Sequence, residues 1–506
     1  MVALSLATDV GLGAPLGSGL RICLLSMRLA EAMNLLADQR RRVYYLALLR
    51  HIGCTVRSED MANLLGDEIE ASPRFAPLDM ADPRQFLPAA VRMLREQFPG
   101  ARLPPALVRM MVNARAMNRG AVAMCEVAQM LADRMGFDDV VQSDIISFPE
   151  RWDGKGMPGR RKGDDLSPAV RVVQLAEGLA LLLHVGDERS ALDAVRARRG
   201  IMYAPDAVDA FLRRPRDVLS AMEIGSMWDV VTQAAPADDG PLDDDRLDAS
   251  LRAMADFADL KSRYLVGHSS GVARLASGAV REAGMPEADA LAVYRAGLVH
   301  DLGRVGVSTA VWAKPGPLSL DEWEKVRMHS YYTDRILSRP EMLHRIGTLA
   351  STHHERLDAS GYFRSLPANH QPPAARVLAA ADAFHAMTEP RPHRPAMSPS
   401  EAARGLRGEV EAGRLDADAS EAVVAAAGER GRRRRPQVAG LTAREVEVLR
   451  LAARGASIRE IARTLVIAPK TADAHLQHIY SKAGVSTRAA ATLFAMQHDL
   501  LEPPSA

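Results

Sequence analysis

The sequence predicts an all-α protein with several domains. Ala, Leu and Arg dominate the composition, and aromatic residues make up only 5% of it, which favours helices. Apolar residues recur at i, i+3 and i+4 spacing in all parts of the chain, as in 20–29 and 288–298, which is typical of amphipathic helices. The 506 residues are enough for roughly three domains of ordinary size.

The composition points to a cytoplasmic protein. Hydrophobic residues make up 47% and charged residues 25% of the chain, as in globular proteins that dissolve in water. The most apolar stretch, Leu179–Val185, is short and closely follows Glu177, so we expect no membrane-spanning helix and no basic, apolar signal peptide. The three cysteines, Cys23, Cys54 and Cys125, form no CxxC pair, and we expect no disulfide framework.

Two stretches without apolar periodicity divide the chain. Residues 236–248, PADDGPLDDDRLD, contain six Asp with Pro and Gly and are expected to form an acidic linker. Residues 428–440, GERGRRRRPQVAG, are expected to form a second, Arg-rich linker. The predicted domains are then 1–215, 250–427 and 441–500.

The first two predicted domains are copies of one another. With an offset of 205, the matched positions include Glu150 and Glu355, Gly156 and Gly361, and Pro168 and Pro373. Further upstream the offset becomes 250, as between Gly53 and Gly303, and the difference of 250 − 205 = 45 residues predicts an insertion within 55–115 of the first copy. A repeat of this length predicts two similar folds.

The second copy carries a cluster of metal-ligand residue types. Nine of the 14 histidines lie between His268 and His393. Imidazole and carboxylate groups are the ligands of divalent Fe, Mn, Ni or Zn. Seven such groups exceed the needs of one ion, whereas two ions about 3.5–4 Å apart, bridged by one Asp, would use them all and could activate a hydroxide for attack on a phosphoester. The seven candidates are His268, His300, Asp301, His329, His353, His354 and Asp382.

The motifs HDLGRVGV at 300–307 and HHERLDASGY at 353–362, together with the order of the seven candidates, resemble the HD-GYP subgroup of the HD phosphohydrolases. The resemblance covers about 257–427 and implies an all-helical domain with two divalent transition metal ions, with iron or manganese the first choice. It implies that His268, His300, Asp301 and Asp382 hold one ion. Asp301 would also bridge to the second ion, held by His329, His353 and His354.

Two departures from the family pattern concern the substrate. The resemblance assigns Asp301 and Arg304 to catalysis and Arg304, Gly361 and Tyr362 to substrate binding, with cyclic di-GMP or another phosphorylated ligand as the default. Arg304 stands where the family has Lys, which keeps the charge but changes its geometry, and Phe363 replaces the Pro of the GYP motif. Whether the domain hydrolyses its ligand or only senses it is therefore left open.

The first copy lacks most of these ligands. Guanidinium and thioether groups do not hold a hard binuclear site, so we expect no metal there. This copy is either a packing partner or a ligand-binding domain. The positions that match the seven ligands hold Ser18, Arg50, His51, Met124, Phe148, Pro149 and Glu177.

The last sixty residues predict four short helices. Two capping boxes, T-x-x-E at 442–445 and S-x-x-E at 457–460, open the first two helices. Glycines that favour the left-handed conformation close the first and third helices, and a proline suits the first turn of the third. The predicted boundary residues are Thr442, Gly455, Ser457, Pro469, Gly484 and Ser486.

This region, with LTAREVEVL at 441–449 and IYSKAGV at 479–485, resembles the LuxR-type helix-turn-helix. The resemblance implies that the third helix binds double-stranded DNA, with a homodimer on two half-sites. Its implied roles are phosphate contacts from Lys470 and Thr471, base contacts from Asp473, Ala474 and Gln477, and a backbone contact from Lys482. Residues 428–506 carry 13 Lys and Arg against 7 Asp and Glu, and the 432–435 run is either a solvated linker or a further phosphate contact.

The order of the parts resembles HD-domain LuxR-type transcriptional regulators of bacteria. The leading hypothesis is a one-chain regulator in which ligand state changes dimerisation or DNA affinity. Two alternatives are a metal-dependent phosphodiesterase regulated by its DNA-binding tail, and a transcription factor with a catalytically dead sensor.

Overall fold

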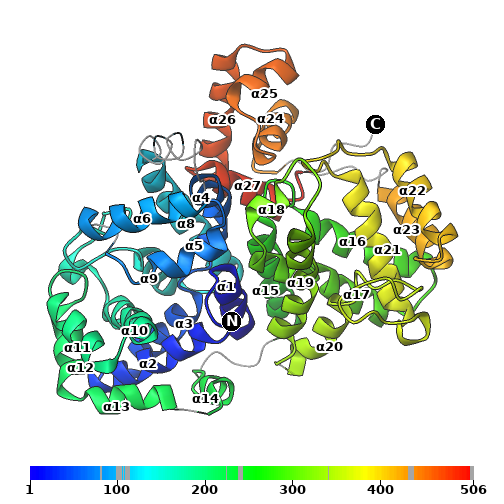
Figure 1. Ribbon diagram of the computed structural model, residues 1–506. Coiled ribbons are helices and arrows are strands. Elements are labelled where there is room, and N and C mark those ends of the chain that lie inside the picture. Colours follow the sequence, from blue (N-terminus) through cyan, green and yellow to red (C-terminus); the bar gives the residue numbers. More distant parts are fainter. Residues whose placement is uncertain are drawn as a thin grey trace. The chain divides into compact units, whose positions relative to one another are not determined.

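The computed structural model describes residues 1–79, 82–97, 114–223, 225–236, 243–339, 341–430 and 438–501, together with Pro105 and Val108. All regular secondary structure in these residues is helical and none of it is a strand (Figure 1), which confirms the predicted all-α class. The chain divides into two compact units, Met1–Arg246, here the first unit, and Leu247–Ala506, the second unit.

The first unit is a helical domain built around α2, which packs against α1, α3 and α10. Its described elements are α1 (Val2–Gly11), α2 (Ser18–Ala32), α3 (Ala37–Leu49), η1 (Cys54–Arg57), α4 (Ser58–Leu65), α5 (Glu68–Phe75), α6 (Pro83–Gln97), α8 (Ala114–Arg134), α9 (Asp139–Ser147), η3 (Gly163–Asp165), α10 (Pro168–Val185), α11 (Glu188–Ala197), α12 (Pro205–Arg213), α13 (Pro215–Leu219), η4 (Ser220–Glu223) and α14 (Met227–Gln233).

The second unit is built around α16, which packs against α17, α21 and α23. Its described elements, the first of which begins just before the unit boundary, are α15 (Asp244–Asp259), α16 (His268–Glu282), α17 (Glu287–Val299), η6 (Leu302–Gly306), α18 (Thr309–Trp312), α19 (Leu320–Leu337), α20 (Glu341–Ala350), η7 (Ala368–His370), α21 (Pro373–Thr388), α22 (Pro399–Glu411), α23 (Ala417–Arg430), α24 (Ala443–Ala453), α25 (Ile458–Leu465), α26 (Pro469–Ala483) and α27 (Arg488–Gln497).

Helix α10 is long and apolar enough, by length and composition, to cross a membrane. One face of it is buried within the first unit, where it packs against α2 and α3. That burial is the behaviour of a core helix in a helical domain.

The repeat extends to individual backbone contacts. A Cβ atom added at Gly53 would lie 2.1 Å from the carbonyl oxygen of Met124, and one added at Gly303 would lie 2.0 Å from that of His329, the residue that matches Met124. Both glycines therefore allow the same close approach of two backbone segments. The peptide bonds Met157–Pro158 and Tyr362–Phe363, also matched positions, are both cis.

Matched carboxylates fix matched loops in the two units. Asp9 accepts hydrogen bonds from the amides of Gly17 and Gly19 at the start of α2. Asp259, 250 residues later, accepts them from the amide and hydroxyl of Ser269 at the start of α16. The sequence comparison did not include the pair Asp9 and Asp259. This pair shows that the repeat begins before the central helix of each unit, α2 or α16.

The first unit has additional helices after its η1 segment. Between α4 and α8 lie α5 and α6, and the three helices α4, α5 and α6 share a small hydrophobic core that includes Leu65, Phe75 and Leu94. In the second unit α18 is followed directly by α19. These helices fall inside the range 55–115 in which the offsets predict an insertion.

The C-terminal helices begin and end close to the predicted residues. Capping boxes at Thr442 and Ser457 open α24 and α25, and Gly484 ends α26 in the left-handed conformation. The prediction for the last helix was wrong by one residue, because Thr487 rather than Ser486 caps α27 through a bond from the Ala490 amide.

The predicted linkers are described only in part. Residues 237–242 and 431–437, which include the arginine run 432–435, lie outside the described residues. The acidic linker prediction extended too far, because α15 already begins at Asp244. Helix α23 likewise continues to Arg430, inside the predicted second linker.

Candidate metal centre

The seven predicted ligands converge at the centre of the second unit. They come from the ends or middles of different helices, as the sequence predicts, and all but His354 are buried. His268 begins α16, His300 and Asp301 follow α17, His329 lies in α19, His353 and His354 follow α20, and Asp382 lies in α21.

Four of these side chains form the first candidate metal cluster: His268, His300, Asp301 and Asp382. His268 Nε2 lies 3.3 Å from Asp301 Oδ2 and 3.2 Å from Asp382 Oδ1. His300 Nε2 lies 3.1 Å from Asp301 Oδ2 and 3.6 Å from Asp382 Oδ1. Ligand atoms about 2.0–2.2 Å from one shared ion lie about this far from each other.

The second candidate metal cluster contains His329, His353 and His354 with the other oxygen of Asp301. His329 Nε2 lies 3.5 Å and His353 Nε2 lies 3.4 Å from Asp301 Oδ1, and the two nitrogens are 3.2 Å apart. Asp301 therefore faces the first cluster with Oδ2 and the second with Oδ1. This is the arrangement required of a bridging carboxylate.

Hydrogen bonds on the outer side of the imidazoles set their orientation. The Nδ1 atoms of His300 and His353 each lie 2.7 Å from a backbone carbonyl oxygen, of Gly297 and Ala350. His329 Nδ1 is bonded in the same way to Val326. These contacts favour a proton on Nδ1 of each ring, so that each Nε2 would direct a lone pair at a bound metal ion.

The pKa values of the histidines shift in opposite directions in the two clusters. Burial lowers the pKa of His329 to about 3, and burial together with His353 holds the pKa of His354 well below its ordinary value. These imidazoles are neutral, which is the form that binds a metal. Burial alone would lower the pKa of His300, but Asp301 beside it raises the pKa to about 9.

Unsatisfied buried atoms indicate that the first cluster suits a cation. His268 Nε2, His300 Nε2, both carboxylate oxygens of Asp301 and Asp382 Oδ1 are buried without a hydrogen-bond partner of good geometry. Buried polar atoms of this kind are costly unless something binds them. Two carboxylates and several imidazoles directed at one point fit a divalent transition metal ion.

Arg304 contacts the carboxylate of Asp301. Its Nη1 lies 2.7 Å from Asp301 Oδ2, and its guanidinium carbon lies 5.1 Å from the centre of the Trp312 ring. Burial would raise the pKa of Asp301, but Arg304 and His300 hold it well below the ordinary value. The guanidinium is thus beside the first cluster, and its predicted contact with substrate stays a prediction.

The loop after the histidine pair closes over the second cluster. Glu355 accepts hydrogen bonds from the amides of Arg364 and Leu366, which fixes the loop. The Tyr362 ring centre lies 4.7 Å from that of His354. Gly361 is buried, and an added Cβ would lie 2.4 Å from the His354 carbonyl oxygen, so this glycine shapes the loop and Tyr362 is left as the candidate for substrate contact.

The sequence interpretation missed Glu389 and His385. His268 Nδ1 lies 2.8 Å from Glu389 Oε2, and His385 Nδ1 lies 3.4 Å from Glu389 Oε1. Arg391 Nη2 lies 3.0 Å from Glu389 Oε2. The i, i+4 spacing of His385 and Glu389 at the end of the helix that carries Asp382 was the available signal.

In the first unit the position that matches the ligand His300 holds Arg50, a cation supplied by the protein itself. Arg50 Nε and His51 Nε2 each lie 2.7 Å from Glu177 Oε1, where Arg50 matches His300 and Glu177 matches Asp382. Met124 lies 3.6 Å from Cys54, with its sulfur toward the thiol. The carboxylate that the first copy keeps is therefore neutralised within the protein, and none of the described candidate metal clusters lies in this unit.

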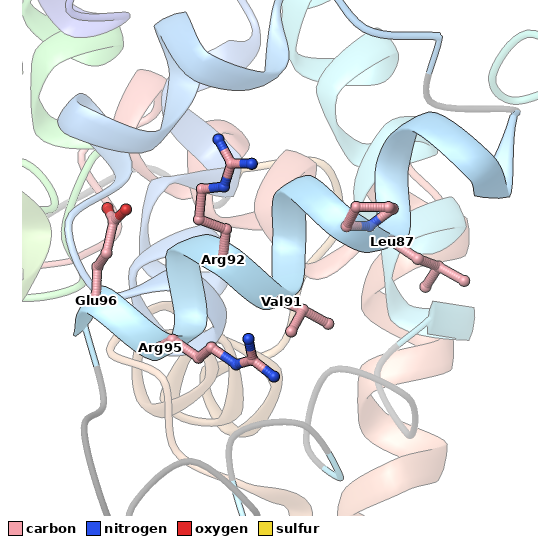
Figure 2. Close-up of a pocket in the computed structure, with 6 residues that line it drawn as sticks. Leu87, Val91, Arg92, Arg95 and Glu96 are labelled. Carbon is pink, nitrogen blue, oxygen red and sulfur yellow. The ribbon is translucent and has the colours of Figure 1, made fainter.

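A separate hollow of about 570 Å³ lies along α6 in the first unit (Figure 2). It contains none of the candidate metal ligands. Its lining residues are Leu87, Pro88, Val91, Arg92, Arg95 and Glu96.

The predicted DNA-contacting residues of α26 lie on its exposed face. Ala472, Leu476 and Ile479 form the buried face of the helix. The exposed residues include Lys470, Thr471, Asp473, Ala474 and Gln477, which matches the arrangement of a recognition helix.

Lys482 differs from the others. Its Nζ lies 2.7 Å from Glu445 Oε2 and donates a further bond to the Gly440 carbonyl oxygen. Burial would raise the pKa of Glu445, but Lys482 and the Thr442 cap lower it to about 2. The prediction that Lys482 serves the DNA backbone overlooked this ion pair, which joins α26 to α24.

Comparison with protein families supports the two domain types expected within the second unit. Residues 252–419 match the HD domain family, and residues 439–495 match the LuxR family of bacterial regulatory proteins. The chain therefore contains an HD domain followed by a LuxR-type helix-turn-helix domain.

Its relatives are phosphodiesterases of the HD-GYP type. The 3'3'-cGAMP-specific phosphodiesterase 3 of Vibrio cholerae is 27% identical over 78% of this chain and 87% of the relative. The cyclic di-GMP phosphodiesterase of Thermotoga maritima is 33% identical over 28% of this chain and 39% of the relative. The crystal structure of the V. cholerae cyclic GMP-AMP specific phosphodiesterase V-cGAP3 has a TM-score of 0.55 at 23% identity, covering 84% of this chain and 96% of that one, which shows a shared fold across both units.

Proposed function

We propose that the protein is a cytoplasmic DNA-binding regulator whose second unit binds two divalent transition metal ions and hydrolyses a 3'3'-linked cyclic dinucleotide. The observation that carries the proposal is the position of Asp301, whose two oxygens face two separate groups of buried imidazole and carboxylate ligands. The relatives named for cyclic GMP-AMP and cyclic di-GMP supply the substrate class, and the first of them aligns with most of this chain.

The chain's own residues can bind and orient a phosphodiester at this site. Bound ions would supply Lewis-acid activation of the phosphoester and of the attacking water. Arg304, beside Asp301 and held over the Trp312 ring, would bind a non-bridging phosphate oxygen. Tyr362, packed on His354, would face the ligand from the other cluster and exclude water.

The α26 helix would read the DNA. Its exposed face carries the residues assigned to phosphates and base edges, and the opposite face is buried. We propose a homodimer that binds two half-sites, with the ligand state of the second unit linked to DNA affinity. A sensor that binds the dinucleotide without cleaving it is the second candidate, and the observation that favours it is Phe363 at the position of the family's Pro.

Hydrolysis of 3'3'-cGAMP and cyclic di-GMP by the Mn²⁺- or Fe²⁺-loaded full chain tests the proposal. Linear dinucleotide should form with the wild type and not with Asp301→Asn, which removes the bridging charge. Asp418→Asn, an exposed residue in the first turn of α23, is the matched control and should retain activity. Binding without cleavage by the wild type would support the sensor, and neither binding nor cleavage would refute both candidates.

The DNA-binding part is tested separately. A selection from random duplexes should recover a two-fold symmetric site. Recovery of no sequence preference, with the protein folded, would refute specific regulation.

A further inference from the structure

We propose that the two metal positions are unequal, and that Glu389 helps the first cluster to hold its ion more tightly than the second. The inference rests on the metal binding in the proposed function, and it assigns Glu389 as a positioning residue. It predicts that the two ions leave the protein at different rates.

The charges of the two clusters differ. The first cluster combines Asp301 Oδ2 and Asp382 Oδ1 with two imidazoles. The second cluster has three imidazoles and the shared Asp301 Oδ1, while Asp382 Oδ2 lies farther off, 3.8 Å from His354 Nδ1. A divalent ion is attracted more strongly by two buried carboxylates than by one.

The outer hydrogen bonds increase this difference. His300, His329 and His353 donate Nδ1–H to backbone carbonyls, whereas His268 donates it to the Glu389 carboxylate at 2.8 Å. A charge-assisted bond is roughly twice as strong as a neutral one and makes the ring a more basic ligand. His268 is therefore the strongest imidazole donor among these four, and it belongs to the first cluster.

Glu389 is held in place for this contact. It is the C-cap residue of α21, the helix that carries Asp382, and its side chain is 16% exposed. Arg391 and His385 contact its two oxygens at 3.0 and 3.4 Å. His385 in turn packs so closely on α16 that a Cβ added at Gly271 would lie 2.0 Å from its Nε2, which limits movement of the ring.

Solvent access favours the same order. The side chains of His268 and His300 are 0% exposed and that of Asp382 is 4% exposed, whereas His354 in the second cluster is 16% exposed. Water and chelators therefore reach the second cluster first.

His268, His385 and Glu389 also lie close enough together to be considered as a third metal group. Two observations oppose that role. Arg391 places a positive charge on Glu389, and His268 needs its Nδ1 proton when Nε2 is the ligand. A third bound ion is therefore an outcome that would contradict the inference.

The test is release of Mn²⁺ from the fully loaded full chain into excess EDTA, with the remaining metal measured after rapid desalting. The wild type should lose one ion quickly and one at least about tenfold more slowly. His329→Gln should remove the fast phase and keep the slow one. The two-phase release from the wild type needs no variant, so it tests the inference even if a substitution unfolds the protein.

Glu389→Gln should speed the slow phase by about 10- to 100-fold, the usual effect of removing an outer-shell partner, and leave the fast phase within about twofold. Glu421→Gln, the same change in an exposed ion pair with Arg407, is the matched control and should alter neither phase. Circular dichroism should show that each variant remains helical.

Equal release of both ions by the wild type, release of three ions by the wild type, or an unchanged slow phase in folded Glu389→Gln would overturn the inference. These outcomes are separate from failure of the proposed function. Unequal release without hydrolysis would leave the inference intact, and hydrolysis with equal release would overturn the inference alone.

Discussion

The carboxylate of Glu177 in the first unit should depend on Arg50. Replacing Arg50 by Met leaves a largely buried carboxylate with His51 as its main partner. Breaking a buried ion pair costs roughly 3–5 kcal/mol. Because the Glu177 side chain is 20% exposed and His51 Nε2 remains 2.7 Å away, we expect a loss of about 2–3 kcal/mol of unfolding free energy.

Native-state hydrogen exchange of the α3 and α10 amides in the full chain measures this loss and assigns it to the first unit. The double variant Arg50→Met with Glu177→Gln should regain much of the stability, because no unpaired charge then remains. Arg74→Met, which breaks an exposed ion pair with Glu96 in the same unit, is the control and should cost less than about 1 kcal/mol.

Glu177 and His51 also predict the pH range in which their ion pair stabilises the first unit most. The pKa of Glu177 falls from 4.5 to about 2 on folding, so its stabilisation is complete above pH 4.5 and disappears as pH falls towards 2. The pKa of His51 rises from 6.5 to about 9, so its stabilisation is complete below pH 6.5 and disappears as pH rises towards 9. The contribution of the pair should therefore be greatest between about pH 4.5 and 6.5.

Three results would refute this reasoning. Arg50→Met within about 0.5 kcal/mol of the wild type would show that the carboxylate does not need the guanidinium. A double variant as unstable as the single variant would show that the loss comes from packing. Protection of α10 that falls when metal is removed would show that the first unit holds an ion after all.

Three further substitutions have defined outcomes. Val466 is 90% exposed with φ of 53°, so Val466→Gly should stabilise α25 and α26 by about 0.5–1 kcal/mol in hydrogen exchange, and a loss of stability would contradict the assigned strain. Gly303→Ala should destabilise the second unit by more than about 2 kcal/mol, because its Cβ would meet the His329 carbonyl at 2.0 Å, and an unchanged melting temperature would contradict that contact. Lys470→Ala should lower the slope of log affinity against log salt by about 1 in anisotropy titrations, and an unchanged slope would remove it from the phosphate contacts.

The sequence was sufficient where the determinants are local or repeated. Capping boxes involve residues three apart, so Thr442 and Ser457 could be identified without a fold. The ligand types also occur in an order that a family resemblance can assign. The structure then supplies what order alone does not, namely that the two oxygens of Asp301 face different clusters.

The sequence was insufficient where a contact depends on tertiary packing. Lys482 contacts Glu445, 37 residues away, because α24 and α26 pack together. The sequence pattern of α26 does not identify this partner. Glu389 lies 121 residues from His268 and follows the last predicted ligand, so only the folded chain identifies it as an outer partner. Thr487 rather than Ser486 caps α27, and two adjacent hydroxyl residues do not reveal in sequence which of them will be the cap.

The proposed binuclear site requires that Asp301 bridge two metal ions in the second unit. Anomalous diffraction from crystals of the Mn²⁺- or Fe²⁺-loaded full chain, collected on both sides of the metal absorption edge, tests it most directly. A bridging Asp301 should give two peaks per chain about 3.5–4 Å apart, one beside each of its oxygens. A single peak, or peaks away from Asp301, would contradict the binuclear site.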